Sequence, residues 1–162
     1  MRTAKGIKYI AIHCSAGFGT LDSIRAFWKS KGWRSPGYHI LIDTDGTIHY
    51  LLDFSKTSNG VLGFNLETIN ICYKGGVENI GTLREPIWKA KDTRTEAQKA
   101  ALETCIEEAK KWLQKNKNTN KIIIQGHRDF SPDKNKNGII ESWERIKECP
   151  SFDAKKEYNE KI

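Results

Sequence analysis

Two histidines and one cysteine occupy positions where a sheet protein presents reactive side chains. His13 follows the apolar run 9–12, and His127 comes two residues after the strand-like run 121–125. Residues beyond the carboxyl ends of buried strands lie at the rim of an α/β sheet, where functional groups usually gather. Cys149 follows charged residues and precedes a proline, which suits a thiolate better than a core position. Imidazole and thiolate together favour zinc, and three protein ligands leave a fourth position for water.

Spacing alone does not establish this metal site. His13 and His127 are 114 residues apart, and His127 and Cys149 are 22 apart, so no local segment brings them together. The alternative is two structural histidines and one incidental cysteine. The remaining cysteines form neither a CxxC pair nor a dense disulfide pattern. Cys72 and Cys105 are predicted to be buried, and Cys14 is predicted to be structural and to face away from the candidate site.

The elements that would position these residues alternate between strands and helices. Two strand-like runs, 38–42 and 47–51, flank Asp45 and Gly46, a strong hairpin signal. Thr95 and Gln98 match a capping box before a long apolar helical stripe. Further strands are predicted at 9–12, 68–73 and 121–125. One helix is predicted to begin at Leu21 with Thr20 as its cap, and a short helix is predicted to begin at about Asp153.

This alternation predicts an α/β fold with a central mixed β-sheet flanked by α-helices. The chain shows no repeat or credible linker, so we expect a single domain over residues 1–162. Its net charge of +7 is not gathered into an arm or stripe, which argues against nucleic-acid binding. No apolar run approaches the roughly 18 residues that span a bilayer, so membrane insertion is not expected. We expect a monomer.

Four motifs in order resemble the zinc N-acetylmuramoyl-L-alanine amidases, the family of phage lysozyme-type amidases and peptidoglycan recognition proteins (PGRPs). The motifs are residues 12–16 (IHCSA), 37–39 (GYH), 126–129 (GHRD) and 147–153 (KECPSFD). The resemblance spans almost the whole chain and implies an amidase/PGRP-like fold. It also implies His13, His127 and Cys149 as zinc ligands, with Tyr38 and Lys147 as catalytic polar residues beside the metal.

The family's reaction is hydrolysis of the amide bond between the lactyl group of N-acetylmuramic acid and L-alanine in peptidoglycan. Zinc would lower the pKa of a water, and Lys147 or Tyr38 would stabilise charge on the carbonyl oxygen. His39 points away from Tyr38 in a strand and is predicted to be a hydrogen-bonded core or second-sphere histidine. His49 is predicted to lie at the surface.

The segment between His127 and Cys149 departs from the family, because many relatives have only a handful of residues there and this chain has 21. Residues 133–144 match the EF-hand loop pattern. The alternative is a polar Asn-Gly turn without a metal. The predicted calcium ligands would be Asp133, Asn135, Asn137, the Ile139 carbonyl and Glu144.

Asn59 marks a second departure, since relatives often carry a groove-lining histidine in the region of residues 58–60. We expect Asn59 to bind substrate in its place. The main competing hypothesis is a non-catalytic peptidoglycan-binding module, although such modules commonly lose the cysteine ligand. No signal peptide is visible, so we expect synthesis in the cytoplasm and action on the cell wall, in the periplasm or outside the cell, after release or export.

Overall fold

The computed structural model describes residues 2–159. Residue 1 and residues 160–162, which belong to the predicted domain of residues 1–162, lie outside the described part. Among the described residues, no helix is both long enough and apolar enough to cross a bilayer.

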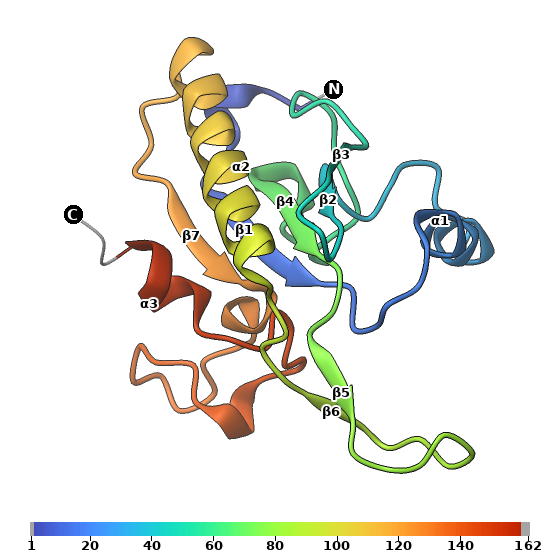
Figure 1. The fold of residues 1–162 in the computed structure, drawn as a ribbon. Coiled ribbons are helices and arrows are strands. Elements are labelled where there is room, and N and C mark those ends of the chain that lie inside the picture. The colour runs from blue at the N-terminus through green and yellow to red at the C-terminus, as the bar shows by residue number, and fades with distance from the viewer. Residues whose placement is uncertain (1, 160–162) are drawn as a thin grey trace.

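A five-stranded mixed sheet forms the centre of the fold, in the order β3-β2-β4-β1-β7 (Figure 1). Its strands are β1 (Tyr9–Cys14), β2 (Ile40–Ile42), β3 (Ile48–Tyr50), β4 (Thr68–Tyr73) and β7 (Ile123–Gly126). The pairs β2–β4, β4–β1 and β1–β7 are parallel, whereas β3 is antiparallel to β2 at one edge. The predicted α/β fold with a central mixed sheet is confirmed.

The two faces of the sheet have different chemistry, because successive side chains of a strand point to opposite sides. Ile10 and Ile12 of β1, with Ile69 and Ile71 of β4, belong to an apolar core that also includes Leu102. The alternate positions on β1 and β4 face the other way and include His13 and Asn70. One face therefore stabilises the fold, and the other carries polar groups.

Helix α2 (Glu96–Lys115) packs on β4 and β2 and supplies the helical half of the core (Figure 1). The predicted capping box is present, because Thr95 and Gln98 exchange side-chain-to-backbone hydrogen bonds. Helix α3 (Ala154–Asn159) packs against β7, and α1 (Leu21–Ser30) lies to one side of the sheet. The four short 3₁₀ segments are Ala4–Gly6, Asn65–Glu67, His127–Phe130 and Ser142–Glu144.

The predicted hairpin forms between β2 and β3, and Gly46 at its turn has φ +87, a conformation that disfavours other residues. A second hairpin, β5 (Val77–Asn79) with β6 (Trp88–Ala90), was not predicted and extends away from the body (Figure 1). Its β6 side chains are exposed, so no buried face gives this segment a periodic pattern. Cys72 and Cys105 are buried as predicted, and Cys14, predicted to be structural, is buried as well.

Candidate metal centre

The structure brings His13, His127 and Cys149 together at the carboxyl ends of β1 and β7. One potential ligand atom from each residue lies within 4.8 Å of the others. The Cys149 Sγ is 3.7 Å from the His13 Nδ1, and the two imidazole centroids are 5.0 Å apart. Within residues 2–159 this is the one group of three or more His, Cys, Asp or Glu side chains with metal-binding geometry. Because β1 and β7 pair in parallel, their carboxyl ends lie side by side and bring His13 and His127 together although they are far apart in sequence.

Both imidazoles are in the protonation state that a metal requires. Burial, followed by the charge of His127, lowers the pKa of His13 to about 3. Burial, followed by the charge of Lys147, lowers the pKa of His127 to about 4. Each ring is therefore neutral at neutral pH and retains a nitrogen lone pair for a cation.

Backbone hydrogen bonds hold the Cys149 segment against the sheet. The Arg128 amide donates to the Cys149 carbonyl at 2.8 Å, and the Tyr73 hydroxyl donates to the Pro150 carbonyl at 2.6 Å. The Cys14 amide donates to the Cys149 Sγ at 3.2 Å. Burial raises the pKa of the Cys149 thiol well above its ordinary value, so a thiolate there needs a cation beside it. Two neutral imidazoles and such a thiol form a donor set that fits zinc.

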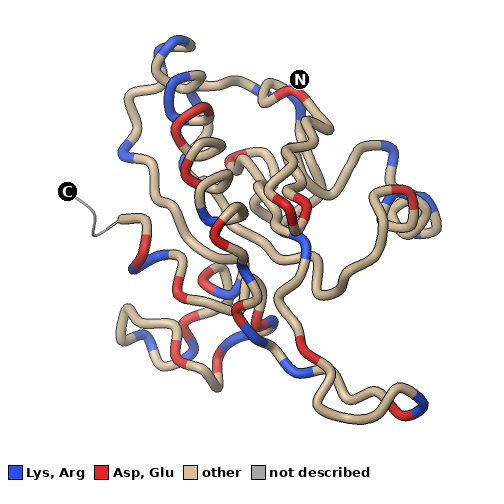
Figure 2. The backbone as a smooth tube through the Cα atoms, viewed as in Figure 1, with Lys and Arg blue, Asp and Glu red and all other residues tan. Residues whose placement is uncertain are grey.

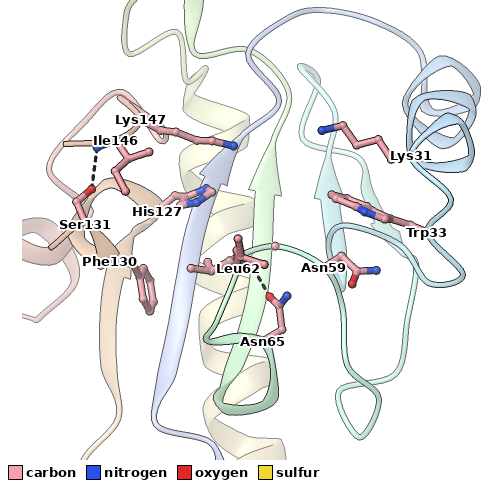
Figure 3. A pocket seen from close by; sticks show the side chains of 12 residues that line it. Lys31, Trp33, Asn59, Leu62, Asn65, His127, Phe130, Ser131, Ile146 and Lys147 are labelled. Carbon is pink, nitrogen blue, oxygen red and sulfur yellow. Dashed lines mark hydrogen bonds between the residues drawn. The ribbon is translucent and has the colours of Figure 1, made fainter.

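Tyr38 and Lys147 approach this centre from two sides. The Tyr38 ring lies 5.1 Å from the His13 ring and packs edge-on against Trp28. Burial raises the pKa of the Tyr38 phenol, so the hydroxyl remains a hydrogen-bond donor at neutral pH. The Lys147 side chain extends above His127 (Figure 3), and the Ile146 amide beside it donates to the Ser131 hydroxyl at 3.0 Å.

A groove of about 400 Å³ opens beside the candidate metal centre and is lined by one of its three residues, His127. Lys31 and Lys147 extend toward each other from its opposite walls, and α2 lies behind the sheet (Figure 3). Asn59 lines the groove as predicted, although its amide nitrogen donates to Ser35. The other lining residues are Trp33, Gly60, Val61, Leu62, Asn65, His127, Phe130, Ser131 and Ile146.

The structure does not support the predicted calcium site in residues 133–144. Glu144 is 1% exposed, and its carboxylate accepts the amides of Lys134, Asn135 and Glu141. The Asp133 carboxylate likewise accepts amides from within the loop. Asn135 and Asn137 accept amides two residues ahead, and nothing in the structure gives the Ile139 carbonyl a metal-binding role. The loop is organised by its own hydrogen bonds.

Several residues at the site were missed by sequence reasoning. Asn70 and Ser58 are fully buried behind His13, and Lys31 and Trp33 lie on the groove wall. A signal for Asn70 was present, because a polar residue between two isoleucines in a central strand is unusual. His39 is buried and hydrogen-bonded, as predicted. His49, predicted at the surface, is partly buried and contacts Asp43 at 2.6 Å.

Comparisons with known proteins agree with this fold. Residues 3–150 match the sequence profile of the N-acetylmuramoyl-L-alanine amidase family. The endolysin of Klebsiella phage KP32 is 30% identical over 151 residues, which are 91% of this chain and 82% of that protein. The endolysin of Escherichia phage T7 is 28% identical over the same shares of the two chains.

Solved structures extend the likeness to the fold. The amidase LysC from Clostridium intestinale superposes with a TM-score of 0.59 at 22% identity, covering 91% of this chain and 78% of that chain. Bumblebee PGRP-SA gives a TM-score of 0.66 at 17% identity, with 97% and 83% covered. The family match covers almost the whole described chain and includes both histidines and Cys149. The chain therefore belongs to the N-acetylmuramoyl-L-alanine amidase family.

Proposed function

We propose that this chain is a zinc-dependent amidase that hydrolyses the bond between the lactyl group of N-acetylmuramic acid and L-alanine in peptidoglycan. The observation that carries the proposal is the convergence of His13, His127 and Cys149 at a groove in a chain of this family. Zinc bound there supplies Lewis-acid chemistry, which makes a water nucleophilic near neutral pH and polarises a carbonyl.

The protein's own groups would stabilise the charge that develops during the reaction. Hydrolysis of an amide places negative charge on its carbonyl oxygen, and the Lys147 ammonium lies at the groove beside His127 (Figure 3). The protonated Tyr38 hydroxyl is a second donor on the other side of His13. Loss of one such donor typically lowers the rate by about 10²–10³-fold.

The groove has surfaces suited to a polymer of sugars and short peptides. Trp33 is 37% exposed and Leu62 is 96% exposed, so both offer apolar contact area. Lys31 and Lys147 provide positive charge for stem carboxylates, and Asn59 provides a carbonyl oxygen. The proposal includes the roles that we predicted from the sequence for Tyr38, Lys147 and Asn59.

The proposed setting is the bacterial cell wall, as the names of the phage endolysin relatives suggest. Lys and Arg residues are interspersed with Asp and Glu along the described backbone (Figure 2), which gives no support to a nucleic-acid-binding role. We propose that the protein acts as a monomer after its release from the cytoplasm.

Digestion of purified peptidoglycan tests the reaction. The protein is stripped of metal by chelation, assayed with and without added zinc, and its products are identified by mass spectrometry. We expect zinc-dependent release of intact stem peptides beginning with L-alanine, from glycan chains that remain uncut. Cys149→Ala should abolish release, whereas Cys105→Ala, which removes a buried thiol on the core side of α2, should retain it.

The competing function is a binding module that recognises peptidoglycan without cleaving it. Wild-type protein that sediments with the wall yet releases no peptide at any zinc concentration would support this alternative. Cleavage within the glycan, or between other peptide residues, would contradict both functions.

A further inference from the structure

We infer that Asn70 is a positioning residue for His13, because its side-chain oxygen accepts the hydrogen of the His13 Nε2 and leaves Nδ1 for the metal. A chain of hydrogen bonds links His39, through Ser58, to Asn70. The functional consequence rests on the proposed zinc centre, but the tautomer itself belongs to the protein without metal.

Strand register places Asn70 next to His13. Asn70 pairs with Ala11 in the parallel β1–β4 ladder, and His13 lies two residues further along β1. Residues two apart share one face of a strand, so the two side chains are diagonal neighbours. Their contact, 2.8 Å between the His13 Nε2 and the Asn70 Oδ1, follows from this register.

The direction of the chain is set at His39 by two backbone groups whose roles cannot change. The Asn70 amide, which can only donate, lies 3.0 Å from the His39 Nδ1. The Lys56 carbonyl, which can only accept, lies 2.8 Å from the His39 Nε2. His39 therefore carries its proton on Nε2. The Arg2 Nη2 is also 3.1 Å from this nitrogen, but it donates to the Phe54 carbonyl at 2.8 Å.

Ser58 links His39 to Asn70. The His39 Nδ1 has one lone pair, and both the Asn70 backbone amide and the Ser58 Oγ lie 3.0 Å from it. The Ser58 oxygen accepts from the Asn70 Nδ2 at 2.7 Å. A flipped amide would require the Ser58 hydrogen to turn to the Asn70 oxygen and would place the Asn70 Nδ2 against the His13 Nε2. The structure has the unflipped orientation, in which the Asn70 Nδ2 donates to Ser58.

With this orientation, the Asn70 Oδ1 faces the His13 Nε2 and requires a hydrogen from it. A neutral imidazole has one N–H, so the His13 Nδ1 carries the lone pair. This nitrogen is on the Cys149 side of the ring, 3.7 Å from the Cys149 Sγ. Hydrogen bonds of this kind orient metal-binding histidines and raise their basicity.

Burial keeps water away from the side chains that form these hydrogen bonds. His39, Ser58 and Asn70 are each 0% exposed, and His13 is 1% exposed. Gly60 makes the close packing possible, because a Cβ at this position would overlap the Asn70 amide. The Asn70 side chain is therefore enclosed by protein atoms on the Gly60 side.

The first test measures the tautomer directly in metal-free wild-type protein, by long-range ¹H–¹⁵N NMR of the histidine rings at neutral pH. We expect His13 to be protonated on Nε2. Protonation on Nδ1, or a mixture of the two tautomers, would overturn the inference. This measurement needs neither a variant nor zinc, so it remains decisive even if the proposed function fails.

The second test compares zinc affinity among variants by competition with a chelator. Asn70→Leu removes the acceptor at similar size, and we expect zinc affinity to fall by about 10–100-fold. Asn70→Asp keeps an acceptor oxygen and should rescue affinity to within a few-fold of wild type. Asn118→Leu is the matched control, because the Asn118 amide also donates to buried carbonyls, those of Ala4 and Ile7, without contacting the candidate ligands.

The outcomes of the affinity test separate positioning from general destabilisation. Wild-type affinity in Asn70→Leu, or an equal loss in Asn118→Leu, would contradict a positioning role. If Asn70→Leu does not fold, Ser58→Ala removes the preceding link and is expected to weaken zinc by a few-fold. If wild-type protein binds no zinc, the proposed metal centre fails, and the tautomer measurement alone judges the hydrogen-bond chain.

Discussion

The two sides of the candidate metal centre are held in different ways. His13 lies on β1 within the sheet, is 1% exposed, and has its Nε2 fixed by Asn70. His127 begins a 3₁₀ turn after β7 and lines the groove, and no residue between 2 and 159 makes a side-chain hydrogen bond to its ring. Cys149 lies on a loop that is held by hydrogen bonds from the Arg128 amide and from the Cys14 amide at the end of β1.

This difference predicts that mutations on the two sides of the centre will have different effects. The sheet side sets the position of one ligand through strand register, which is costly to disturb. The loop side carries His127 on a 3₁₀ turn, and Lys147 and Cys149 on segments outside the strands and helices. Perturbations on the sheet side should therefore change both folding and metal binding, whereas those on the loop side should change metal binding or catalysis with less effect on folding.

The largest expected effect comes from removing either histidine. We expect His13→Ala and His127→Ala each to weaken zinc by more than about 100-fold, since loss of a ligand should exceed loss of its hydrogen-bond partner. In metal-free protein, His13→Ala should also lower the free energy of unfolding by about 1–3 kcal/mol, because it leaves the buried Asn70 Oδ1 without a donor. Urea unfolding and chelator competition measure the two effects, and equal destabilisation by the two variants would contradict the comparison.

Removing the charge of Lys147 tests the loop side. We expect Lys147→Met to lower kcat by about 10²-fold while zinc affinity changes by less than a few-fold, because the ammonium acts on developing charge. Steady-state kinetics on a defined muramyl peptide, with zinc content measured in parallel, would separate an effect on kcat from an effect on zinc affinity. Lys134→Met in the insert is the charge-matched control, and an equal loss there would exclude a specific role for Lys147.

The sequence correctly predicted the structural features that depend on short-range patterns of residues. Apolar strand runs, the turn at Gly46 and the Thr95–Gln98 capping box all have short-range signals, and each is present in the structure. The three candidate ligands were found through motif resemblance rather than spacing. Asn70 and Ser58 were not found, because their role depends on the β1–β4 register and on contacts between distant segments. The exposed β5–β6 hairpin and the closed hydrogen bonding of the 133–144 loop likewise depend on pairing that residue types do not specify.

Acid should destabilise the metal-free protein through its buried histidines. Burial lowers the pKa of His39 to about 4, and the hydrogen bond from the His39 Nε2 to the Lys56 carbonyl opposes the shift. Between this value and the usual value near 6.5 the unfolded chain binds a proton that the folded chain does not, so stability falls as pH falls. We expect a slope of about 1.4 kcal/mol per pH unit for each such histidine, measured by urea unfolding between pH 7 and pH 4.5. Stability that is constant or rises on acidification would contradict the buried, neutral assignment.

The smallest expected effect concerns the insert. Glu144→Ala removes the acceptor of three backbone amides, and we expect it to lower the free energy of unfolding by about 1–3 kcal/mol. Glu141→Ala, whose carboxylate accepts from the exposed side chains of Asn135 and Trp143, is the control and should cost less. An equal cost in thermal or urea unfolding would show that Glu144 does not organise the loop.

X-ray absorption spectroscopy of the zinc-loaded protein tests the central claim, the composition of the metal centre, most directly. We predict one sulfur at about 2.3 Å and two imidazole nitrogens at about 2.0–2.1 Å, with a light atom in the fourth position. Cys149→Ala should remove the sulfur shell. A zinc ion coordinated only by nitrogen and oxygen, or by two sulfurs, would contradict a centre built from His13, His127 and Cys149.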